Sequence, residues 1–321
     1  MIQDCFETSS PTSLGLSSSC PQLSTCFGMM ISSTALSFRL LALTAIPALA
    51  QFASTTTFTF TGDTLPTGLV VSSDTIDDRS GHSSATFNHQ FNPDNVQVKD
   101  GYLELIVPGG QTTSPLQCAE VSTDFEVLYA SVTTYAILTD EAGVCNGMFF
   151  YHSDSQEIDI EWISDANSTS NLDANNGTRV MQYTNQGPHG EEDSSEVYGQ
   201  APEDATSAVH EYRLDWVNRT STFYLDGVFQ QQIQTNVPTT SGNWVWNNWA
   251  DGDPDFTVGP PKNDAVFKIQ KIVMQYNTTA DDQQQSSTPA NSTASTSLGT
   301  ARTPPVQMAA ILILFGAVFF M

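Results

Sequence analysis

Glu157-Ile158-Asp159-Ile160-Glu161-Trp162 alternates acidic and apolar residues with a period of two. In a β-strand, successive side chains point to opposite faces, so this segment places three carboxyl groups on one face and three apolar side chains on the other. The apolar face is typical of a strand that packs against a core. The acidic face is unusual, because three like charges in a row repel one another.

The sequence on both sides of this segment has the same strand character. Short stretches rich in β-branched and aromatic residues are separated by turn residues, and none has a convincing helical period. The clearest stretches are YLELIV at 102–107, VLYASVTTYAIL at 127–138, HEYRLDWV at 210–217 and AVFKIQKIVMQY at 265–276. Asp226-Gly227 suits the two-residue type I′ turn of a hairpin. The pattern predicts an all-β fold, an antiparallel β-sandwich.

Three interpretations of the acidic face follow from the residues themselves. Hydrolysis of a glycosidic bond needs one carboxylate as nucleophile or base and one carboxylic acid that protonates the leaving oxygen. Glu157 and Glu161 would supply this pair, and Asp159 between them would hydrogen-bond to one of them and help to set its charge. Crowding raises the pKa of at least one member of such a set. The same face is also compatible with a solvated surface or with a calcium site.

The charge balance excludes some partners. Ten Lys and Arg residues stand against 35 Asp and Glu residues in a chain of 321, a formal charge of −25. Binding to nucleic acid or to anionic lipid requires clustered cations, so we expect neither. A neutral polysaccharide is compatible with this charge, and so is a charge that serves only solubility.

The N-terminal region resembles a processing signal. Residues 29–50 contain one Arg, an apolar run and Ala48-Leu49-Ala50, which is typical of a secretory signal peptide with a small-x-small cleavage site. Residues 1–28 show no clear periodicity, and we interpret them as a mis-assigned N-terminal extension, with the true start at Met29 or Met30. The alternative is a genuine long N-terminal region. The sequence therefore predicts a secreted protein.

The C-terminal region has the composition of a surface anchor. Residues 281–307 form a linker rich in Ser and Thr, and residues 308–321 are apolar throughout. Fourteen apolar residues are short for a spanning helix. Small residues, a polar spacer and an apolar tail are typical of a GPI-anchor signal, with an attachment site between Asn291 and Gly299. An uncleaved membrane anchor is the alternative, and either would place residues 51–280, the predicted catalytic domain, at the cell surface or wall.

Cysteines and sequons agree with secretion. Cys118 and Cys145 are the two cysteines of the predicted domain, and in an oxidising compartment one disulfide between them is the simplest expectation. The spacing of Cys and His residues matches no zinc site. Predicted N-glycosylation sites are Asn167, Asn176, Asn218, Asn277 and Asn291.

Five segments together resemble glycoside hydrolase family 16. The segment Glu157–Glu161 is similar to the catalytic signature of that family, which includes lichenases, laminarinases and fungal wall glucan transglycosylases. Further similar segments, in the same order between Glu157 and Trp249, are Val180–Asn185, His210–Trp216, Phe223–Val228 and Asn236–Trp249. The resemblance implies a concanavalin A-like jelly roll with a concave glycan-binding cleft and retaining chemistry.

The resemblance also implies roles for individual residues. By position, Glu157 would be the nucleophile, Asp159 its helper and Glu161 the general acid/base. Cleft residues that would bind substrate are Tyr183, Asn185, Asn247 and Trp249. No extra residue separates the helper from the acid, which favours the lichenase and transglycosylase branches over the laminarinases.

Three functions from different classes are compatible with these features. The first is hydrolysis of β-1,3 or β-1,3-1,4 glucan, and the second is wall transglycosylation, in which a sugar replaces water as the acceptor. The third is glycan binding without catalysis, since a fold does not determine a function. In each case we expect a monomer whose partner is β-glucan and which contacts the membrane only through its lipid anchor. We expect no cofactor and no catalytic metal, although a structural calcium ion is compatible with the sequence.

Overall fold

The computed structural model describes residues 52–77, 84–175 and 177–281. The predicted extension 1–28, the signal peptide 29–50, the apolar tail 308–321 and all but the first residue of the linker lie outside the described residues. Within the described part, no helix has both the length and the apolar character needed to cross a bilayer. The described residues are therefore those of the predicted catalytic domain.

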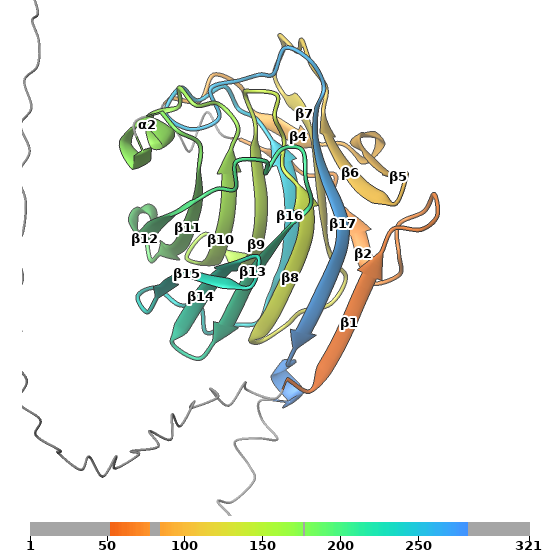
Figure 1. The fold of residues 1–321 in the computed structure, drawn as a ribbon, viewed down its shortest axis with the longest axis vertical. Helices are drawn as coiled ribbons and strands as arrows, with labels where there is room; N and C mark the ends of the chain where they lie inside the picture. Colours follow the sequence, from red (N-terminus) through yellow and green to blue (C-terminus); the bar gives the residue numbers. More distant parts are fainter. Residues whose placement is uncertain (1–51, 78–83, 176, 282–321) are drawn as a thin grey trace, which may run out of the picture. The chain divides into compact units, whose positions relative to one another are not determined.

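The described strands form two sheets that pack face to face (Figure 1). One is eight-stranded, in the order β15(Val228–Ile233), β14(Thr220–Leu225), β13(His210–Val217), β8(Ala130–Ile137), β17(Ala265–Tyr276), β6(Tyr102–Val107), β5(Val96–Lys99), with β1(Ser54–Thr59) also paired to β17. The other is nine-stranded, in the order β12(Gly190–Gln200), β11(Val180–Gly187), β10(Gln156–Ile163), β9(Cys145–Ser153), β16(Asn243–Trp249), β7(Leu116–Thr123), β4(His89–Phe91), β3(Thr75–Ile76), with β2(Leu69–Val71) also paired to β7.

Helical structure is scarce in the described residues. It includes the 3₁₀ turn η1(Pro93–Asn95), the helix α2(Thr169–Asn175) in the connection between β10 and β11, and helical residues 279–281 after β17. Among the described strands only β4 and β7 pair in parallel, and the other pairs are antiparallel. The predicted all-β sandwich, of the jelly-roll type, is confirmed.

The core between the sheets explains why β10 has a single possible register. Ile158, Ile160 and Trp162 are buried against the opposite sheet, which contributes Leu214 and Trp216. Burying one such side chain contributes about 1.5–3 kcal/mol. A slip of β10 by one residue would expose all three and turn its acids into the core. The apolar residues of β10 thereby determine which way its carboxyl groups point.

The predicted hairpin turn is present between β14 and β15. Asp226 and Gly227 both have positive φ, 50° and 73°, as a type I′ turn requires. The Asp226 carboxylate also ties the turn to β13, because its Oδ1 accepts from the backbone N–H of Glu211 and its Oδ2 lies 2.8 Å from His210 Nδ1. Burial opposes ionisation of Asp226, but these hydrogen bonds outweigh it and lower the pKa of the carboxyl group.

Asp226→Asn tests this anchor while keeping a residue that tolerates positive φ. A carboxyl group whose pKa is lower in the folded than in the unfolded protein stabilises the fold above its unfolded pKa, near 3.9, and loses that effect as the pH falls through the folded pKa. We expect the free energy of unfolding in urea to fall by about 1 kcal/mol at pH 6, a value reduced for the solvent exposure of the pair. At pH 2–3 the two proteins should be equally stable. If the variant is still less stable than the wild type at pH 2–3, its lower free energy of unfolding comes from a change in the turn and not from loss of the charge.

Candidate active site

The outward face of β10 carries the three predicted catalytic carboxyl groups. β10 lies between β9 and β11, and the face opposite the core is here called the acid face. Glu157 and Glu161 are half-buried on it, whereas Asp159 between them is only 3% exposed. The sheet thus brings together the three acids that the sequence predicted, with their side chains turned away from the apolar core.

An irregularity in strand pairing lies beside Glu157. Gln156 is opposite Ser153, but Glu157 is opposite Tyr151, so His152 is an extra residue on β9. Such β-bulges bend a strand and re-aim the side chains next to them. In a regular strand the Cα atoms of Glu157 and Glu161 would lie about 13 Å apart. The bulge bends β9 where it pairs with the start of β10, next to Glu157.

Asp159 is held by a neighbouring strand. Gln186 on β11 donates from Nε2 to Asp159 Oδ2 over 3.2 Å. Phe149 and Thr184 lie directly opposite Asp159 on β9 and β11. The central acid is thus buried among an aromatic ring and polar groups, which fixes its position between the two glutamates.

On β9, the position beside Glu161 has no side chain of its own and is filled by the amide of Asn247. Gly147 lies directly opposite Glu161, and Asn247 of β16 lies opposite Gly147 on the other side. A Cβ atom on Gly147 would lie 2.5 Å from Asn247 Oδ1, which accepts from the Gly147 backbone N–H. The glycine therefore allows the close approach of the Asn247 amide, which fills the acid face at this position, and a role of Asn247 in substrate binding stays a prediction.

A fourth carboxyl group, which the sequence analysis did not single out, joins the acid face beyond Asn247. Asn247 donates from Nδ2 to Glu120 Oε2 on β7, and Ser72 donates to Glu120 Oε1 over 2.7 Å. Burial raises the pKa of Glu120, although these two hydrogen bonds act in the opposite direction. Glu120 orients the Asn247 amide and so belongs to the support of the site.

Trp249 shares the acid face with Asn247, two positions along β16. Its ring stacks against His89 and Phe256, with ring centroids 5.1 and 5.7 Å away. These contacts make Trp249 part of an aromatic cluster at one end of the sheet. The other two tryptophans of β16, Trp244 and Trp246, are buried in the core, as their opposite parity requires.

The prediction that Tyr183 and Asn185 reach the cleft is wrong. Tyr183 lies opposite Ile160, and Asn185 lies opposite Ile158, so both share the core face of the sheet. Tyr183 is 1% exposed and stacks on Phe223 of the other sheet. Asn185 is fully buried and donates to the backbone carbonyl of Thr235. Directly opposed residues of paired strands point to the same face, and this register decides the matter.

Their neighbours occupy the acid face instead. Gln182 is opposite Glu161, Thr184 is opposite Asp159, and Gln186 binds Asp159. On β9, Tyr151 is opposite Glu157, and its hydroxyl donates to Asp154. The alternation within each strand could be predicted from the sequence. The pairing register between one strand and the next could not.

The predicted disulfide between Cys118 and Cys145 is also wrong for this structure, which has two buried thiols. Cys145 lies opposite Trp249, and Cys118 lies on the far side of β16, because Ala119 is opposite Asn248. Cα atoms two strands apart are about 9.5 Å from each other, beyond the ~4.4–6.8 Å of disulfides. The Cys145 thiol instead donates to Glu161 Oε1 over 3.5 Å.

Thiol titration tests this assignment. Burial, and then the neighbouring Glu161 carboxylate, raise the pKa of the Cys145 thiol well above its ordinary value. We expect the native domain, residues 51–280 purified without reductant, not to consume a thiol reagent at pH 8. In denaturant, the same protein should consume two equivalents of the reagent. Cys145→Ser should reduce the count to one. If the denatured protein reacts only after a reductant is added, the two cysteines form a disulfide and the assignment of two free thiols is wrong.

Three of the five predicted glycosylation sites lie among residues whose surroundings are described. Asn167 and Asn218 are exposed, so their use stays a prediction. Asn277 is 6% exposed, and its Oδ1 accepts from the backbone N–H of Ala53, so the structure does not support a glycan there. Asn176 and Asn291 lie outside the described residues.

A calcium site was one of the three interpretations of the acidic residues of β10. Among the described residues, no group of three or more His, Cys, Asp or Glu side chains is placed to hold a metal ion. What the described geometry offers is a row of carboxyl groups, amides and a thiol across one sheet face, which is suited to proton transfer and to hydrogen bonding with hydroxyl groups.

This combination defines a class of protein, a β-sandwich that carries an acid–base site on the open face of one sheet. The sequence model of glycosyl hydrolases family 16 matches residues 83–265, more than half of the chain. The chain belongs to this family.

Two curated relatives are similar over part of the chain. Congo red hypersensitive protein 1 of Saccharomyces cerevisiae is 25% identical over 170 residues, which are 48% of this chain and 31% of that protein. The beta-glucanase of Paenibacillus polymyxa is 27% identical over 169 residues, or 51% of this chain and 65% of that protein. The chain thus spans about a third and just under two thirds of the lengths of these relatives.

Solved structures share the fold. The catalytic domain of an endo-1,3-beta-glucanase (laminarinase) from Thermotoga petrophila superposes with a TM-score of 0.55 at 16% identity, covering 70% of this chain and 98% of that one. The Bacillus licheniformis beta-glucanase superposes with a TM-score of 0.50 at 17% identity, covering 68% and 97%. At these identities the likeness concerns the fold alone.

Proposed function

We propose that this protein is a retaining β-glucan hydrolase or transglycosylase that works through Glu157, Asp159 and Glu161. The observation that carries the proposal is the acid face, where one strand presents all three carboxyl groups. Membership of a family of glycosyl hydrolases supports the reaction class. The similarity to a beta-glucanase and to the fold of an endo-1,3-beta-glucanase supports β-1,3 or β-1,3-1,4 glucan as the substrate.

In the first step, the Glu157 carboxylate attacks the anomeric carbon and the bond from that carbon to the glycosidic oxygen breaks. Glu161, protonated, gives its proton to the departing oxygen. The products are a glycosyl ester on Glu157 and a shortened glucan with a new hydroxyl group. Asp159, held by Gln186, stays beside Glu157 and stabilises the arrangement of the two glutamates.

In the second step, Glu161, now ionised, takes a proton from an incoming hydroxyl group, and that oxygen attacks the anomeric carbon. The ester bond to Glu157 breaks and both glutamates return to their first states. Water as the incoming group gives hydrolysis, and a sugar hydroxyl gives transglycosylation. Retaining chemistry requires the two carboxyl groups to approach to about 5–5.5 Å.

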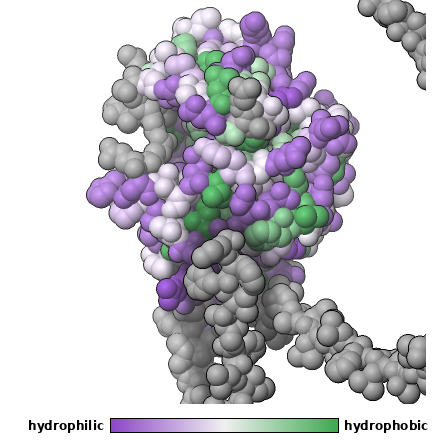
Figure 2. Space-filling view, turned by 60° about the vertical axis from the view of Figure 1, so that its left-hand side comes forward, coloured by the Kyte–Doolittle hydropathy of each residue, from purple (hydrophilic) through white to green (hydrophobic). Residues whose placement is uncertain are grey.

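The polar surface supports a polysaccharide partner. On the side of the molecule in Figure 2, hydrophilic residues dominate and hydrophobic residues form small separate groups. Large apolar patches are typical of protein or membrane contacts, and sugar hydroxyls favour polar surroundings. We further propose that the protein is secreted and held at the cell surface or wall by a GPI anchor. The composition of residues 29–50 and 308–321 supports this location.

Replacement of the nucleophile is the direct test. Glu157→Gln should retain the fold and lose turnover by about a thousandfold or more, because no covalent intermediate can form. Glu203→Gln, at an exposed carboxylate of the same domain, is the matched control and should keep full activity. In Glu157→Ala, azide should restore turnover of an activated glucoside and yield a glycosyl azide. Recovery of activity without a glycosyl azide would assign the nucleophile elsewhere.

The choice between hydrolysis and transfer is tested with an acceptor. Residues 51–280 and the Glu157→Gln variant are incubated with laminarin, mixed-linkage glucan or chitin oligomers and a fluorescent oligosaccharide. Labelled products longer than the acceptor, absent with the variant, would establish a transglycosylase. Short unlabelled products would establish a hydrolase and identify the linkage. Binding of a glucan without any turnover would leave the third function, a glycan-binding wall protein.

A further inference from the structure

Cys145 places its thiol against the proposed acid/base. It is the first residue of β9, two positions before Gly147, and Gly147 lies directly opposite Glu161. Residues two apart in a strand point to the same side, so Cys145 shares the acid face. Its thiol donates to Glu161 Oε1 over 3.5 Å, and Cys145 is fully buried. The neighbouring strand thus supplies a hydrogen-bond donor that water does not reach.

This thiol keeps its proton over the acidic and neutral pH range. Burial, and then the Glu161 carboxylate, raise the pKa of the Cys145 thiol well above its ordinary value. Asp159 of β10 and Asp251, which follows β16, raise the pKa further. Only a thiolate is a nucleophile or a metal ligand. The role that remains for Cys145 is that of a weak but permanent donor to a carboxyl oxygen.

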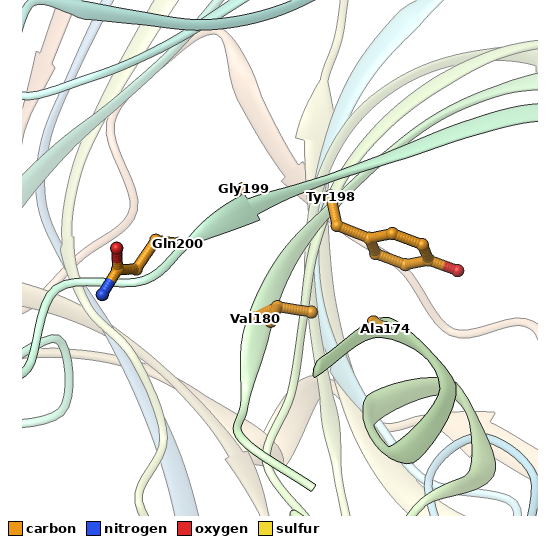
Figure 3. Close-up of a pocket in the computed structure, with 5 residues that line it drawn as sticks. All are labelled: Ala174, Val180, Tyr198, Gly199 and Gln200. Atoms are coloured by element: carbon orange, nitrogen blue, oxygen red, sulfur yellow. The ribbon is translucent and has the colours of Figure 1, made fainter. Parts of the chain in front are cut away.

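The residue on the other flank of Glu161 does not duplicate this hydrogen bond. Gln182 of β11 lies directly opposite Glu161, but its Nε2 has no hydrogen-bond partner in the protein. Gln182 is in turn opposite Tyr198, which lines a cavity of about 290 Å³ at the β12 edge (Figure 3). The residues that line this cavity are uncharged: Ala174, Val180, Tyr198, Gly199 and Gln200.

A fixed donor to one oxygen decides which oxygen of Glu161 carries the transferable proton. In a neutral carboxyl group one oxygen holds the proton, and the other, the carbonyl oxygen, is the better acceptor. The S–H group on Oε1 therefore favours protonation of Oε2. Once Glu161 has lost its proton, the same S–H group stabilises the carboxylate, because hydrogen bonds to a charged acceptor are stronger than those to a neutral one.

We propose that Cys145 is a positioning residue for acid–base catalysis, whose thiol holds Glu161 Oε1 and directs proton exchange with the glucan to Oε2. The proposal rests on the proposed function of Glu161. In the first step the O–H bond at Oε2 breaks and the glycosidic oxygen takes the proton. In the second step Oε2 takes a proton from the incoming hydroxyl group. The thiol keeps its own proton throughout and forms no covalent bond.

Leaving-group dependence separates this role from a structural one. Cys145→Ala removes the donor, and its kcat/KM on the natural glucan should fall about tenfold, because departure of a sugar oxygen needs a well-placed proton. An aryl glucoside with an activated leaving group needs little protonation and should lose much less. Cys145→Ser keeps a donor and should recover most of the loss. Equal losses on both substrates, or equal behaviour of the Ala and Ser variants, would overturn the proposal.

The pH profile of kcat/KM gives a second readout. Its basic limb reports the acid of the free enzyme, and a hydrogen bond to the charged form of a group lowers the pKa of that group. Loss of the thiol in Cys145→Ala should therefore move the basic limb to higher pH, by about half a unit for a weak donor. The variants leave in place the neighbouring carboxyl groups of β7, β10 and the segment after β16, namely Glu120, Glu157, Asp159 and Asp251.

Cys118→Ala is the matched control. Its thiol is equally buried, but it donates to the backbone carbonyl of Ala250 over 3.8 Å. This variant should keep the wild-type rates and the wild-type basic limb. A basic limb that stays in place in Cys145→Ala, or that moves equally in Cys118→Ala, would overturn the assignment to Cys145.

Infrared spectroscopy tests the hydrogen bond without any turnover. The difference between the spectra of the wild type and of Cys145→Ala at pH 8 isolates the S–H stretching band of Cys145. In a Glu161→Gln background this band should move to higher wavenumber, because a neutral acceptor forms a weaker hydrogen bond. An unmoved band would overturn the proposal while leaving the proposed function intact. Absence of wild-type turnover on every glucan would overturn the proposed function, and the catalytic role of the thiol with it.

Discussion

The alternation of side chains along β10 is the constraint on which the candidate site depends. Ile158, Ile160 and Trp162 bury themselves against the opposite sheet, and the geometry of a strand then leaves the acids only the outward face. The same packing that stabilises the domain also assembles the carboxyl groups. Mutual repulsion among the acids costs stability, but burial of three large apolar groups on the same strand exceeds that cost.

The neighbouring strands supply the polar side chains that surround the carboxyl groups of β10. On one side, Gly147 admits the Asn247 amide, which forms a hydrogen-bonded pair with Glu120. On the other side, Gln186 holds the central acid. The polar residues of the acid face thus come from segments far apart in the sequence, and the order of strands in the sheet, with β16 inserted between β9 and β7, brings them together.

The sequence was sufficient for features that depend on one segment. The strand at Glu157 follows from local alternation, and the Asp-Gly turn follows from the needs of a hairpin. Features that depend on which strands pair, and in which register, could not be predicted from the sequence. The orientation of Tyr183 required the register of β11 against β10, and the fate of the cysteines required knowledge that β16 separates their strands. Glu120, a single acid in an otherwise ordinary strand, had no local signal at all.

The spacing of the cysteine strands has a consequence for how the domain can be made and kept. Because a whole strand lies between Cys118 and Cys145, no covalent cross-link holds the nine-stranded sheet together at that point. Folding of the described domain then relies on hydrophobic burial and strand pairing, which do not depend on the redox potential of the surroundings. A reductant therefore has no bond to break between these two strands.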